Sequence, residues 1–468
     1  MPEAVVIGAG QAGGPLAGAL SEAGWKVTLI EREHVGGTCV NEGCTPTKAM
    51  IASAKAAHVA RSSGKLGVYA EVRVSLPEIV DRVQGLVADF RGGSERGVLK
   101  AGVTLLGGEA RFTGVREVEV SLPSGETRSL RADQVFINTG ASPRWPELPG
   151  LAELKGQGAL TSRELLLLRD LPDQLLVLGG GYISLEFAQM YARLGSRVTV
   201  IESGERLLPR EDEDVAGALQ KVLEGEGVTF HLGTKATRAA RSGEGVTLEV
   251  HQADGQALSL NGSHLLVAVG RAPNTEGLNI GATGGTLDEH GFVVVDEHLL
   301  AAEGVYALGD VKGGPAFTHV SYDDYRIVRD AVLSGQSRSY HDRPLPYTLF
   351  TDPQLGRVGQ DRAQALKSGR PVRVYTLPMT SVARAIETGE TAGLMRAVVD
   401  DETDLLTGIT VLGSEGGEVM SALQLAMMGG LSATALRNAV IAHPTLCESV
   451  NNLFTSDPEV LGRRDAQS

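Results

Sequence analysis

The chain has 468 residues, of which 42% are hydrophobic and 21% charged, and its formal net charge is -14 at pH 7. This length is too great for a single hydrophobic core, so we expect several domains. The acidic balance argues against nucleic acid as a partner, and no apolar run reaches the roughly 18 residues that cross a membrane. We therefore expect a cytoplasmic protein, in which three cysteines are too few for a structural framework and favour a catalytic or metal-binding pair.

The first predicted element is a buried strand at residues 4–7, followed by a turn, a helix and a strand that ends at Glu31. The turn has the GxGxxG spacing, formed by Gly8, Gly10 and Gly13. In this pattern the first glycine permits the tight turn, the second lets the backbone approach a pyrophosphate, and the third brings helix and strand together. The acid accepts hydrogen bonds from a ribose diol. These features predict a dinucleotide-binding unit.

Next come Cys39 and Cys44, just before a helix that we predict from residue 47 to about residue 62. Pro46 suits the first helical position, which places Cys44 at or just before the helix N-terminus. The helix dipole stabilises a thiolate there, and Lys48 adds a positive charge on the same face. The four-residue gap is short enough to close a disulfide. A zinc half-site or two buried thiols are the alternatives, although no second CxxC and no nearby histidine pair supports zinc.

The strand–turn–helix–strand pattern returns at residues 175–202. Its turn contains Gly179 and Gly181, with Ser184 in place of the third glycine, and Glu202 ends its second strand. An acid at that position favours the 2′-hydroxyl of NAD over the 2′-phosphate of NADP, although two arginines follow closely. Two such units in one chain predict two bound nucleotides.

The remaining segments alternate between short strands, helices and turns. Turn residues follow residue 138 and residue 267, and a Pro-Leu-Pro linker stands at 344–346. We predict further strands at residues 115–120, 134–138, 292–295, 304–308, 372–377, 393–399 and 406–412, and further helices at 416–428 and 433–438.

In this order the motifs resemble those of the pyridine nucleotide–disulfide oxidoreductases, a family that includes glutathione reductase, dihydrolipoamide dehydrogenase and mercuric reductase. The run GGTCVNEGC at residues 36–44 is similar to their redox-active segment, VGRAPN at 269–274 to their crossover, and HPTLCE at 443–448 to their dimerisation motif. The resemblance extends over nearly the whole chain. It implies an α/β fold with two Rossmann-like nucleotide-binding domains, for FAD and NAD(P), and an α+β dimerisation domain. The implied limits are 1–150 and 273–343 for the two FAD-binding segments, 151–272 for the NAD(P)-binding domain and 344–468 for the dimerisation domain.

The resemblance also implies a role for each matched catalytic residue. Cys39 would be the interchange thiol that attacks the substrate, and Cys44 the charge-transfer thiolate against the flavin. Lys48 and Glu186 would pair near the reactive flavin nitrogen, and Tyr182 would gate the nicotinamide pocket.

A homodimer is implied as well, with an active site shared between its subunits. His443 of the other subunit would act as the acid–base, and Glu448 would orient its imidazole. The N-terminus of the helix that begins near Phe317 would face the pyrimidine edge of the flavin. The implied FAD contacts are Gly8, Gly10, Gly13, Glu31, Gly37, Thr38, Thr139, Gly140, Gly309, Asp310, Phe317 and Thr318, and the NAD(P) contacts are Gly179, Gly181, Tyr182, Ile183, Glu202 and Gly270.

Two departures from the family pattern concern the substrate. Mercuric reductases end in a vicinal cysteine pair, whereas residues 451–468 contain no cysteine, and the metal-binding N-terminal extension is missing. Residues 317–328 and 347–353 are similar to the mercuric-reductase-like branch that includes the reactive-chlorine-resistance flavoproteins. Cys447 lies between the two dimerisation-motif residues. It is expected to be a small buried filler, with a third thiol for a soft metal ion or a mixed disulfide as the alternative.

These observations lead to one expected function and two alternatives. Hydride would pass from NAD(P)H, with NADH favoured, to FAD and then to the Cys39–Cys44 disulfide. Cys39 would reduce a small-molecule disulfide or a soft metal ion, in a role in cell redox homeostasis, and no resident metal is expected. The alternatives are dihydrolipoamide dehydrogenase and a flavin-bound redox sensor, and the acid–base dyad argues against the sensor.

Overall fold

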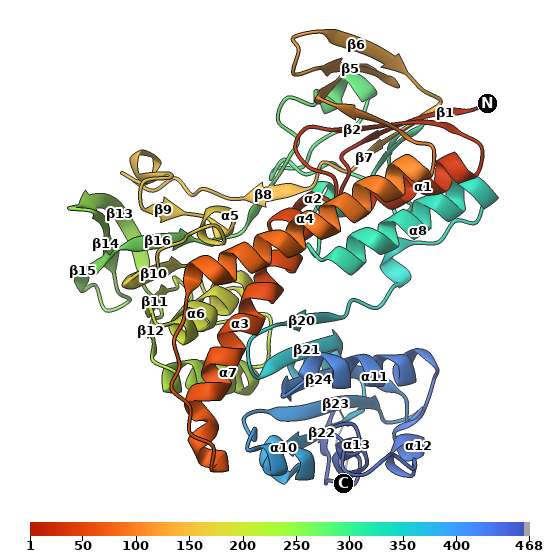
Figure 1. The fold of residues 1–468 in the computed structure, drawn as a ribbon. Coiled ribbons are helices and arrows are strands. Elements are labelled where there is room, and N and C mark those ends of the chain that lie inside the picture. The colour runs from red at the N-terminus through yellow and green to blue at the C-terminus, as the bar shows by residue number, and fades with distance from the viewer. Residues whose placement is uncertain (463–468) are drawn as a thin grey trace.

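The computed structural model describes residues 1–462, and its elements build three large sheets with helices packed around them (Figure 1). The first two sheets consist mainly of parallel strands, and the third is antiparallel. This architecture confirms the predicted α/β class. No helix within residues 1–462 is both long enough and apolar enough to span a bilayer.

The first sheet has the strand order β18-β19-β7-β1-β2-β3, so the N-terminal strand lies near its centre. β1 and β7 are nearly continuous apolar runs and are buried, as expected of parallel strands covered on both faces. Its strands are β1 Glu3–Ile7, β2 Lys26–Glu31, β3 Thr104–Gly107, β7 Gln134–Ile137, β18 Leu300–Ala302 and β19 Val305–Ala307. The helices of this part are α1 Gly13–Glu22, α2 Gly37–Asn41, α3 Cys44–Ser62, α4 Leu76–Lys100 and α8 Thr318–Ser334.

The second sheet repeats this plan with the order β12-β11-β10-β16-β9. In each sheet, the strand before the glycine turn (β1 or β10) has a parallel neighbour on each side. The chain reaches these two neighbours through separate crossover connections. This is the topological switch point at which open α/β sheets bind nucleotides. Its strands are β9 Ala159–Leu160, β10 Gln174–Leu178, β11 Arg197–Ile201, β12 Val228–His231 and β16 His264–Val267, and its helices are α5 Ser162–Leu165, α6 Tyr182–Leu194 and α7 Glu213–Gly225.

The third sheet is antiparallel, with the order β20-β21-β24-β23-β22-β25. α11 packs on β21 and β24, and α13 packs on β22 and β23, nearer the opposite edge of the sheet, and both helices share one hydrophobic core. Its strands are β20 Tyr347–Leu349, β21 Gln354–Gly359, β22 Val372–Pro378, β23 Leu394–Asp400, β24 Leu406–Gly413 and β25 Glu459–Leu461. Its helices are α9 Arg362–Ser368, α10 Ala383–Thr388, α11 Gly416–Met428, α12 Ala433–Arg437 and α13 Ser449–Leu453.

Smaller antiparallel sheets complete the fold. One hydrophobic cluster joins α3 to the second and third sheets, because it contains Met50 of α3, Leu185 of α6 and Leu355 of β21. The redox-active segment before α3 is therefore anchored at the junction of all three parts. The smaller strands are β4 Glu109–Gly114, β5 Glu117–Ser121, β6 Thr127–Arg131, β8 Ala141–Pro143, β13 Lys235–Ser242, β14 Gly245–His251, β15 Ala257–Gly262 and β17 Arg271–Pro273.

Most predicted elements coincide with observed ones to within two residues, and the exceptions have physical causes. The helix predicted from Thr47 begins at Cys44, so Pro46 is its third residue. A proline is tolerated there because the first-turn N–H groups have no partner within the helix. The strand predicted at residues 292–295 is wrong, because this segment forms only an isolated bridge at Val293. The side chain of Val293 packs into the core beneath the first sheet instead.

Candidate active site

The glycine turn between β1 and α1 has no room for side chains. Gly8 has a φ of +101°, and a Cβ atom on it would lie 2.3 Å from the backbone oxygen of Asn138. A Cβ atom on Gly13 would lie 2.1 Å from the backbone oxygen of Gly8. Glu31 Oε2 accepts a hydrogen bond from the amide of Ala9 at 2.8 Å. The turn is thus held in a shape that leaves the N-terminus of α1 available to an anion such as a pyrophosphate.

Buried polar atoms beside this turn indicate a ligand. Thr139 Oγ1 and Arg271 Nε are buried and have no hydrogen-bond partner within the described residues. Burial lowers the pKa of Arg271 and raises the pKa of Asp310, whose carboxylate lies 3.9 Å from Arg271 Nε. Because buried polar atoms are normally satisfied, these groups fit a large polar cofactor at this position. They agree with the predicted FAD site.

The second glycine turn repeats the arrangement. A Cβ atom on Gly179, whose φ is +109°, would lie 2.6 Å from the backbone oxygen of Ala268. Glu202 accepts hydrogen bonds from the amide of Gly180 at 2.5 Å and from the amide of Gly204 at 2.6 Å. The carboxylate therefore lies against the turn, where the ribose of a nucleotide would be recognised.

The redox-active segment packs directly on the first glycine turn. Gly37 has a φ of +60°, and a Cβ atom on it would lie 2.8 Å from the Cα atom of Gly10. The amide of Gly36 donates to the backbone oxygen of Ala9 at 2.9 Å. Close backbone contact therefore places the cysteines beside the nucleotide turn, an arrangement that only glycine at position 37 permits.

Cys39 lies in α2, and Cys44 is the first residue of α3. The two thiols are unbonded in this structure, and a hydrogen bond joins them. This bond lowers the pKa of Cys44 to about 6 and raises the pKa of Cys39. The Thr318 hydroxyl lies 3.3 Å from Cys44 Sγ, and this contact and the charge of Lys48 also lower the pKa of Cys44. Cys44 is therefore the thiol prepared to be a thiolate at neutral pH.

An ion pair lies one helical turn beyond Cys44. Lys48 Nζ donates to Glu186 of α6 at 2.8 Å, and the amide of Phe350 donates to the same carboxylate at 2.9 Å. The ammonium also lies 4.7 Å from the centre of the Phe350 ring. The predicted pair therefore joins α3, beside the first sheet, to α6, beside the second sheet. Phe350, which follows β20 of the third sheet, supports the carboxylate.

The other predicted site residues lie on a small number of turns and helix ends. Phe317 is the N-cap of α8, and Gly140 and Gly309 have φ values of +69° and +72°. Gly270 has a φ of +114°, and Ile183 is the second residue of α6 and is exposed. These positions surround the two glycine turns.

The predicted acid–base dyad is formed within the chain. His443 Nδ1 lies 2.8 Å and 3.0 Å from the two carboxylate oxygens of Glu448. The side chain of His443 is 66% exposed. Glu448 is the N-cap of α13, which packs on β22 and β23 and lies far from α2 (Figure 1). The chain by itself does not bring the dyad to the cysteines.

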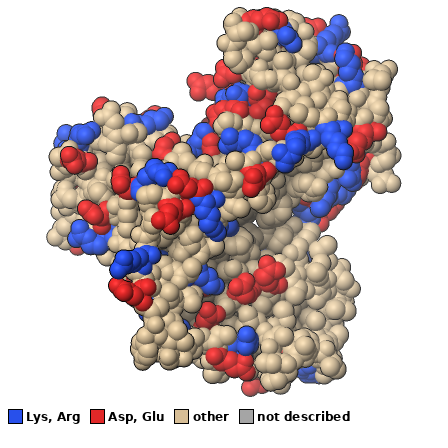
Figure 2. Space-filling model, viewed as in Figure 1, with Lys and Arg blue, Asp and Glu red and all other residues tan. Residues whose placement is uncertain are grey.

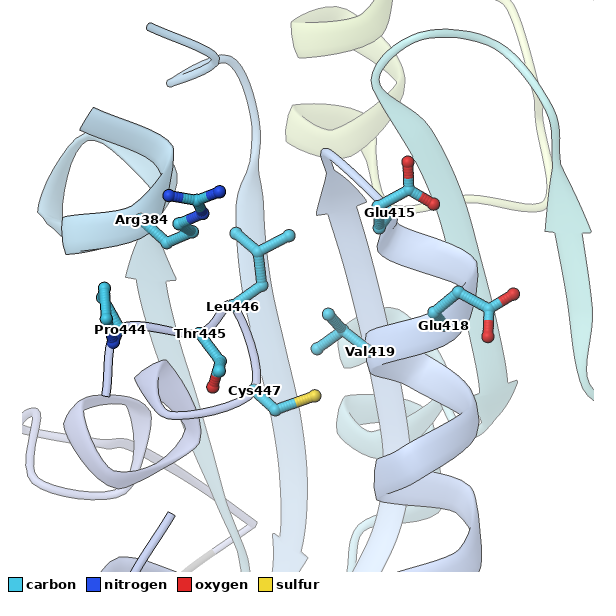
Figure 3. Close-up of a pocket in the computed structure, with 8 residues that line it drawn as sticks. All are labelled: Arg384, Glu415, Glu418, Val419, Pro444, Thr445, Leu446 and Cys447. Carbon is cyan, nitrogen blue, oxygen red and sulfur yellow. The ribbon is translucent and has the colours of Figure 1, made fainter. Parts of the chain in front are cut away.

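Cys447 lies at the edge of the core of the third sheet. Figure 3 shows its sulfur directed toward α11, in a groove of about 530 Å³ that also contains Arg384 and Glu418. Burial raises the pKa of Cys447, so at neutral pH it is a thiol rather than a thiolate. This environment favours the filler interpretation.

Several contacts at the site are not evident from the sequence. Asn138 Oδ1 accepts from the amide of Gly13 at 2.8 Å, and its Nδ2 donates to the oxygen of Leu308 at 2.9 Å, which joins three separate segments of the first sheet. Its position directly after β7 was the available signal. Arg163 of α5 forms an ion pair with Glu42 between the two cysteines, and burial raises the pKa of Glu42. No local pattern pointed to this pair.

Charged side chains of both signs are interspersed over the face of the molecule drawn in Figure 2, including the region around α3 and α4. Ion pairs such as Arg169–Asp81, at 2.7 Å, account for part of this mixture. Such exposed pairs contribute little to stability, because water and salt screen their charges.

Comparison with known proteins agrees with this geometry. The family model for pyridine nucleotide-disulphide oxidoreductase matches residues 2–324, and the model for the dimerisation domain of the same family matches residues 345–454. The chain is 36% identical over 458 residues to the probable pyridine nucleotide-disulfide oxidoreductase RclA of Escherichia coli, with 97% of this chain and 98% of that protein covered.

Two further relatives are named as enzymes with different activities. A dihydrolipoyl dehydrogenase of Halobacterium salinarum is 33% identical, with 96% of this chain and 94% of that protein covered. A mercuric reductase of Streptomyces lividans is 34% identical, with 97% of this chain and 96% of that protein covered.

A solved structure supports the same assignment. The structure described as a Cu(II) complex of the HOCl-induced flavoprotein disulfide reductase RclA from Escherichia coli superposes with a TM-score of 0.88 at 35% identity, with 97% of this chain and 99% of that chain covered. Members of this family use FAD and NAD(P)H. The two glycine turns, the cysteine pair and these matches together show that the chain belongs to the class I pyridine nucleotide-disulfide oxidoreductases and is an NAD(P)H-dependent flavoprotein oxidoreductase.

Proposed function

We propose that this enzyme passes electrons from NAD(P)H through the Cys39–Cys44 pair to a small-molecule disulfide or a soft metal ion. The observation that carries the proposal is the cluster of Cys39, Cys44 and Thr318 beside the Lys48–Glu186 pair. When bound, FAD supplies the transfer of two electrons between the nicotinamide and the cysteine pair. The residues of the chain then determine which thiol meets the substrate.

For a disulfide substrate, His443 of the second subunit would take the proton of Cys39, whose pKa is raised. Cys39 would then attack one sulfur, form a mixed disulfide and release the other half as a thiolate. Cys44, whose pKa is lowered to about 6, would then attack Cys39. This second attack restores the Cys39–Cys44 disulfide and releases the second thiol. His443 of the second subunit, oriented by Glu448, would protonate the leaving thiolates. One disulfide is reduced to two thiols for each pair of electrons.

The identity of the acceptor is best tested with one substrate panel. Purified enzyme is assayed with lipoamide, glutathione disulfide, mercuric ion and cupric ion, with NADH and NADPH in parallel. We expect turnover with a disulfide or a soft metal ion and a preference for NADH, because Glu202 is suited to the 2′-hydroxyl of a ribose. Turnover with lipoamide alone would instead favour dihydrolipoamide dehydrogenase, an alternative that the intact His443–Glu448 dyad keeps open.

A Cys44→Ser variant tests the cysteine assignment in the same assays. We expect it to lose reduction of every acceptor, because the Cys39–Cys44 disulfide that accepts the electrons can no longer form. We also expect it to lose the long-wavelength charge-transfer band on anaerobic reduction. Cys447→Ser is the control and should retain both properties. A Cys44→Ser enzyme that retains the band would contradict the assignment.

The organisation of the assembly is also part of this proposal. We propose a cytoplasmic homodimer in which each active site uses residues of both subunits, in agreement with the match to the dimerisation-domain model. The proposed domain limits are 1–150 and 273–343 for FAD, 151–272 for NAD(P) and 344–468 for dimerisation, of which residues 463–468 lie outside the described part of the chain.

A further inference from the structure

A buried carboxylate, Glu211, binds two tyrosines that belong to different parts of the chain. Its side chain is 1% exposed, and its Oε1 accepts hydrogen bonds from the Tyr182 hydroxyl at 2.8 Å and the Tyr347 hydroxyl at 2.5 Å. Arg357 lies 3.3 Å from its Oε2 and balances its charge. Burial and the charge of Glu211 raise the pKa of both phenols, so each remains a hydrogen-bond donor. A phenol that donates to a carboxylate makes a strong hydrogen bond.

Tyr182 connects the second nucleotide turn to the face of α6 that carries Glu186, the partner of Lys48. It is the first residue of α6, directly after the second glycine turn, and Glu186 follows one helical turn later. Its ring centroid is 5.5 Å from that of Tyr347, which in turn stacks on Phe317 at 5.6 Å. Phe317 is the N-cap of α8, the helix whose first residue contacts Cys44. A nicotinamide ring that approached from the glycine turn would therefore meet the ring of Tyr182.

Glu211 is held in place independently of Tyr182. Its amide donates to the oxygen of Leu208 at 2.9 Å, and Arg206 donates to its backbone oxygen at 2.9 Å. Arg357 also donates to the oxygen of Arg210 at 2.6 Å. The backbone of Glu211 is therefore anchored independently of Tyr182, and its carboxylate keeps Tyr347 and Arg357 if Tyr182 moves.

We propose that Glu211 is a positioning residue that holds Tyr182 in a closed position, so that a nicotinamide nucleotide binds only after the Tyr182–Glu211 hydrogen bond breaks. This inference rests on the proposed use of NAD(P)H at this site. When Tyr182 leaves, Glu211 keeps Tyr347 and Arg357, so no buried charge is left without a partner. The fraction of closed molecules reduces the apparent affinity for the nucleotide. A single hydrogen bond is weak enough for nucleotide binding to reverse it.

The first test removes only the Tyr182 hydroxyl. Tyr182→Phe keeps the ring, and we expect the dissociation constant for NAD⁺, measured by calorimetric titration of the FAD-loaded enzyme, to fall about 3- to 10-fold. The KM for NADH should fall in parallel. The matched control is Tyr191→Phe on the same helix, where a buried phenol donates to the oxygen of Leu165 at 2.6 Å. This control loses a buried hydrogen bond far from Glu211, and its affinity for NAD⁺ should not change.

A second variant shows whether Tyr182 and Glu211 act through one bond. Glu211→Gln weakens the acceptor and should also lower the dissociation constant for NAD⁺. Tyr182→Phe/Glu211→Gln should bind no more tightly than Tyr182→Phe alone, because both changes remove the same interaction. If Glu211→Gln does not fold, Tyr182→Phe and Tyr191→Phe decide the question.

The proposal is overturned if Tyr182→Phe leaves the affinity for NAD⁺ unchanged or weakens it. It is also overturned if the effects of Tyr182→Phe and Glu211→Gln on the binding free energy are additive in the double variant. A wild-type enzyme that NADH does not reduce would be a different result, because it would refute the proposed function itself. Wild-type reduction by NADH with no effect of Tyr182→Phe refutes the role of Glu211 alone.

Discussion

At the scale of single residues, the two cysteines are chemically distinct although they lie in one short segment. The hydrogen bond from Cys39, the contact with Thr318 and the charge of Lys48 all stabilise the thiolate of Cys44. The same hydrogen bond raises the pKa of Cys39. The difference in pKa between the two thiols therefore results from the groups around them and not from any chemical difference between the cysteines themselves.

The environment of Cys44 predicts how the charge-transfer band depends on pH. A thiolate is present above its pKa, so the charge-transfer band of the reduced enzyme should disappear as the pH falls through about 6. Thr318→Val removes the hydroxyl that lies 3.3 Å from Cys44 Sγ and should move the midpoint upward by roughly 0.5–1 pH unit. Thr45→Val is the control, because Thr45 is not among the groups that shift this pKa. An unchanged midpoint in Thr318→Val would show that the hydroxyl does not stabilise the thiolate.

At the scale of elements, the approach of α1 to β1 shapes the proposed FAD site. A Cβ atom at Gly13 would lie 2.1 Å from the backbone oxygen of Gly8, a contact that no side-chain movement can relieve. At Gly18, further along the same helix, a Cβ atom would lie 3.8 Å from Ala101 Cβ, which is ordinary contact. Gly13 and Gly18 of α1 thus serve different purposes.

Substitutions at Gly13 and Gly18 give a matched test of the glycine turn. Gly13→Ala should force α1 away from β1, cost about 1–3 kcal/mol of stability and lower the FAD content of the purified protein. Gly18→Ala should keep full FAD content and raise stability by up to about 1 kcal/mol, because alanine is the better helix former. The measurements are the melting temperature and the ratio of flavin to protein absorbance. Equal FAD content in both variants would argue against a close-packed turn.

At the scale of the whole molecule, the chain separates its thiols from its acid–base dyad. The cysteines lie beside the first sheet, whereas the predicted dyad adjoins α13 on the third sheet, where His443 is exposed and Glu448 is half-buried. The match to the dimerisation-domain model supports a homodimer, and the second subunit is the proposed source of the acid–base group.

Subunit complementation tests this separation. Cys39→Ser and His443→Ala should each be inactive as homodimers. A mixed dimer should contain one complete site, built from Cys39 of one subunit and His443 of the other. After equal mixing and random exchange of subunits, about a quarter of wild-type activity should return. No recovery, with exchange confirmed by differently tagged subunits, would place both residues of each site on one chain.

Much of the fold and of the candidate site could be predicted because the relevant signals are local. The glycine turns, their acids and the cysteine segment each span a few residues whose backbone geometry permits little else. The strand at residues 292–295 was predicted wrongly because an apolar run does not specify a pairing partner. Glu211 and Tyr347 were missed because they are 136 residues apart in the sequence and form no motif.

Local sequence patterns specify the chemistry that this protein carries: two nucleotide-binding turns, a cysteine pair at a helix start, and the order of the three parts. Short-range steric and electrostatic rules are enough for these features. The residues that support this chemistry are brought together by the packing of the whole fold. Thr318 contacts a cysteine 274 residues away, and Glu211 joins Tyr182 to Tyr347, because packing of the three sheets brings these side chains together. Such contacts depend on the whole fold, and no local spacing encodes them.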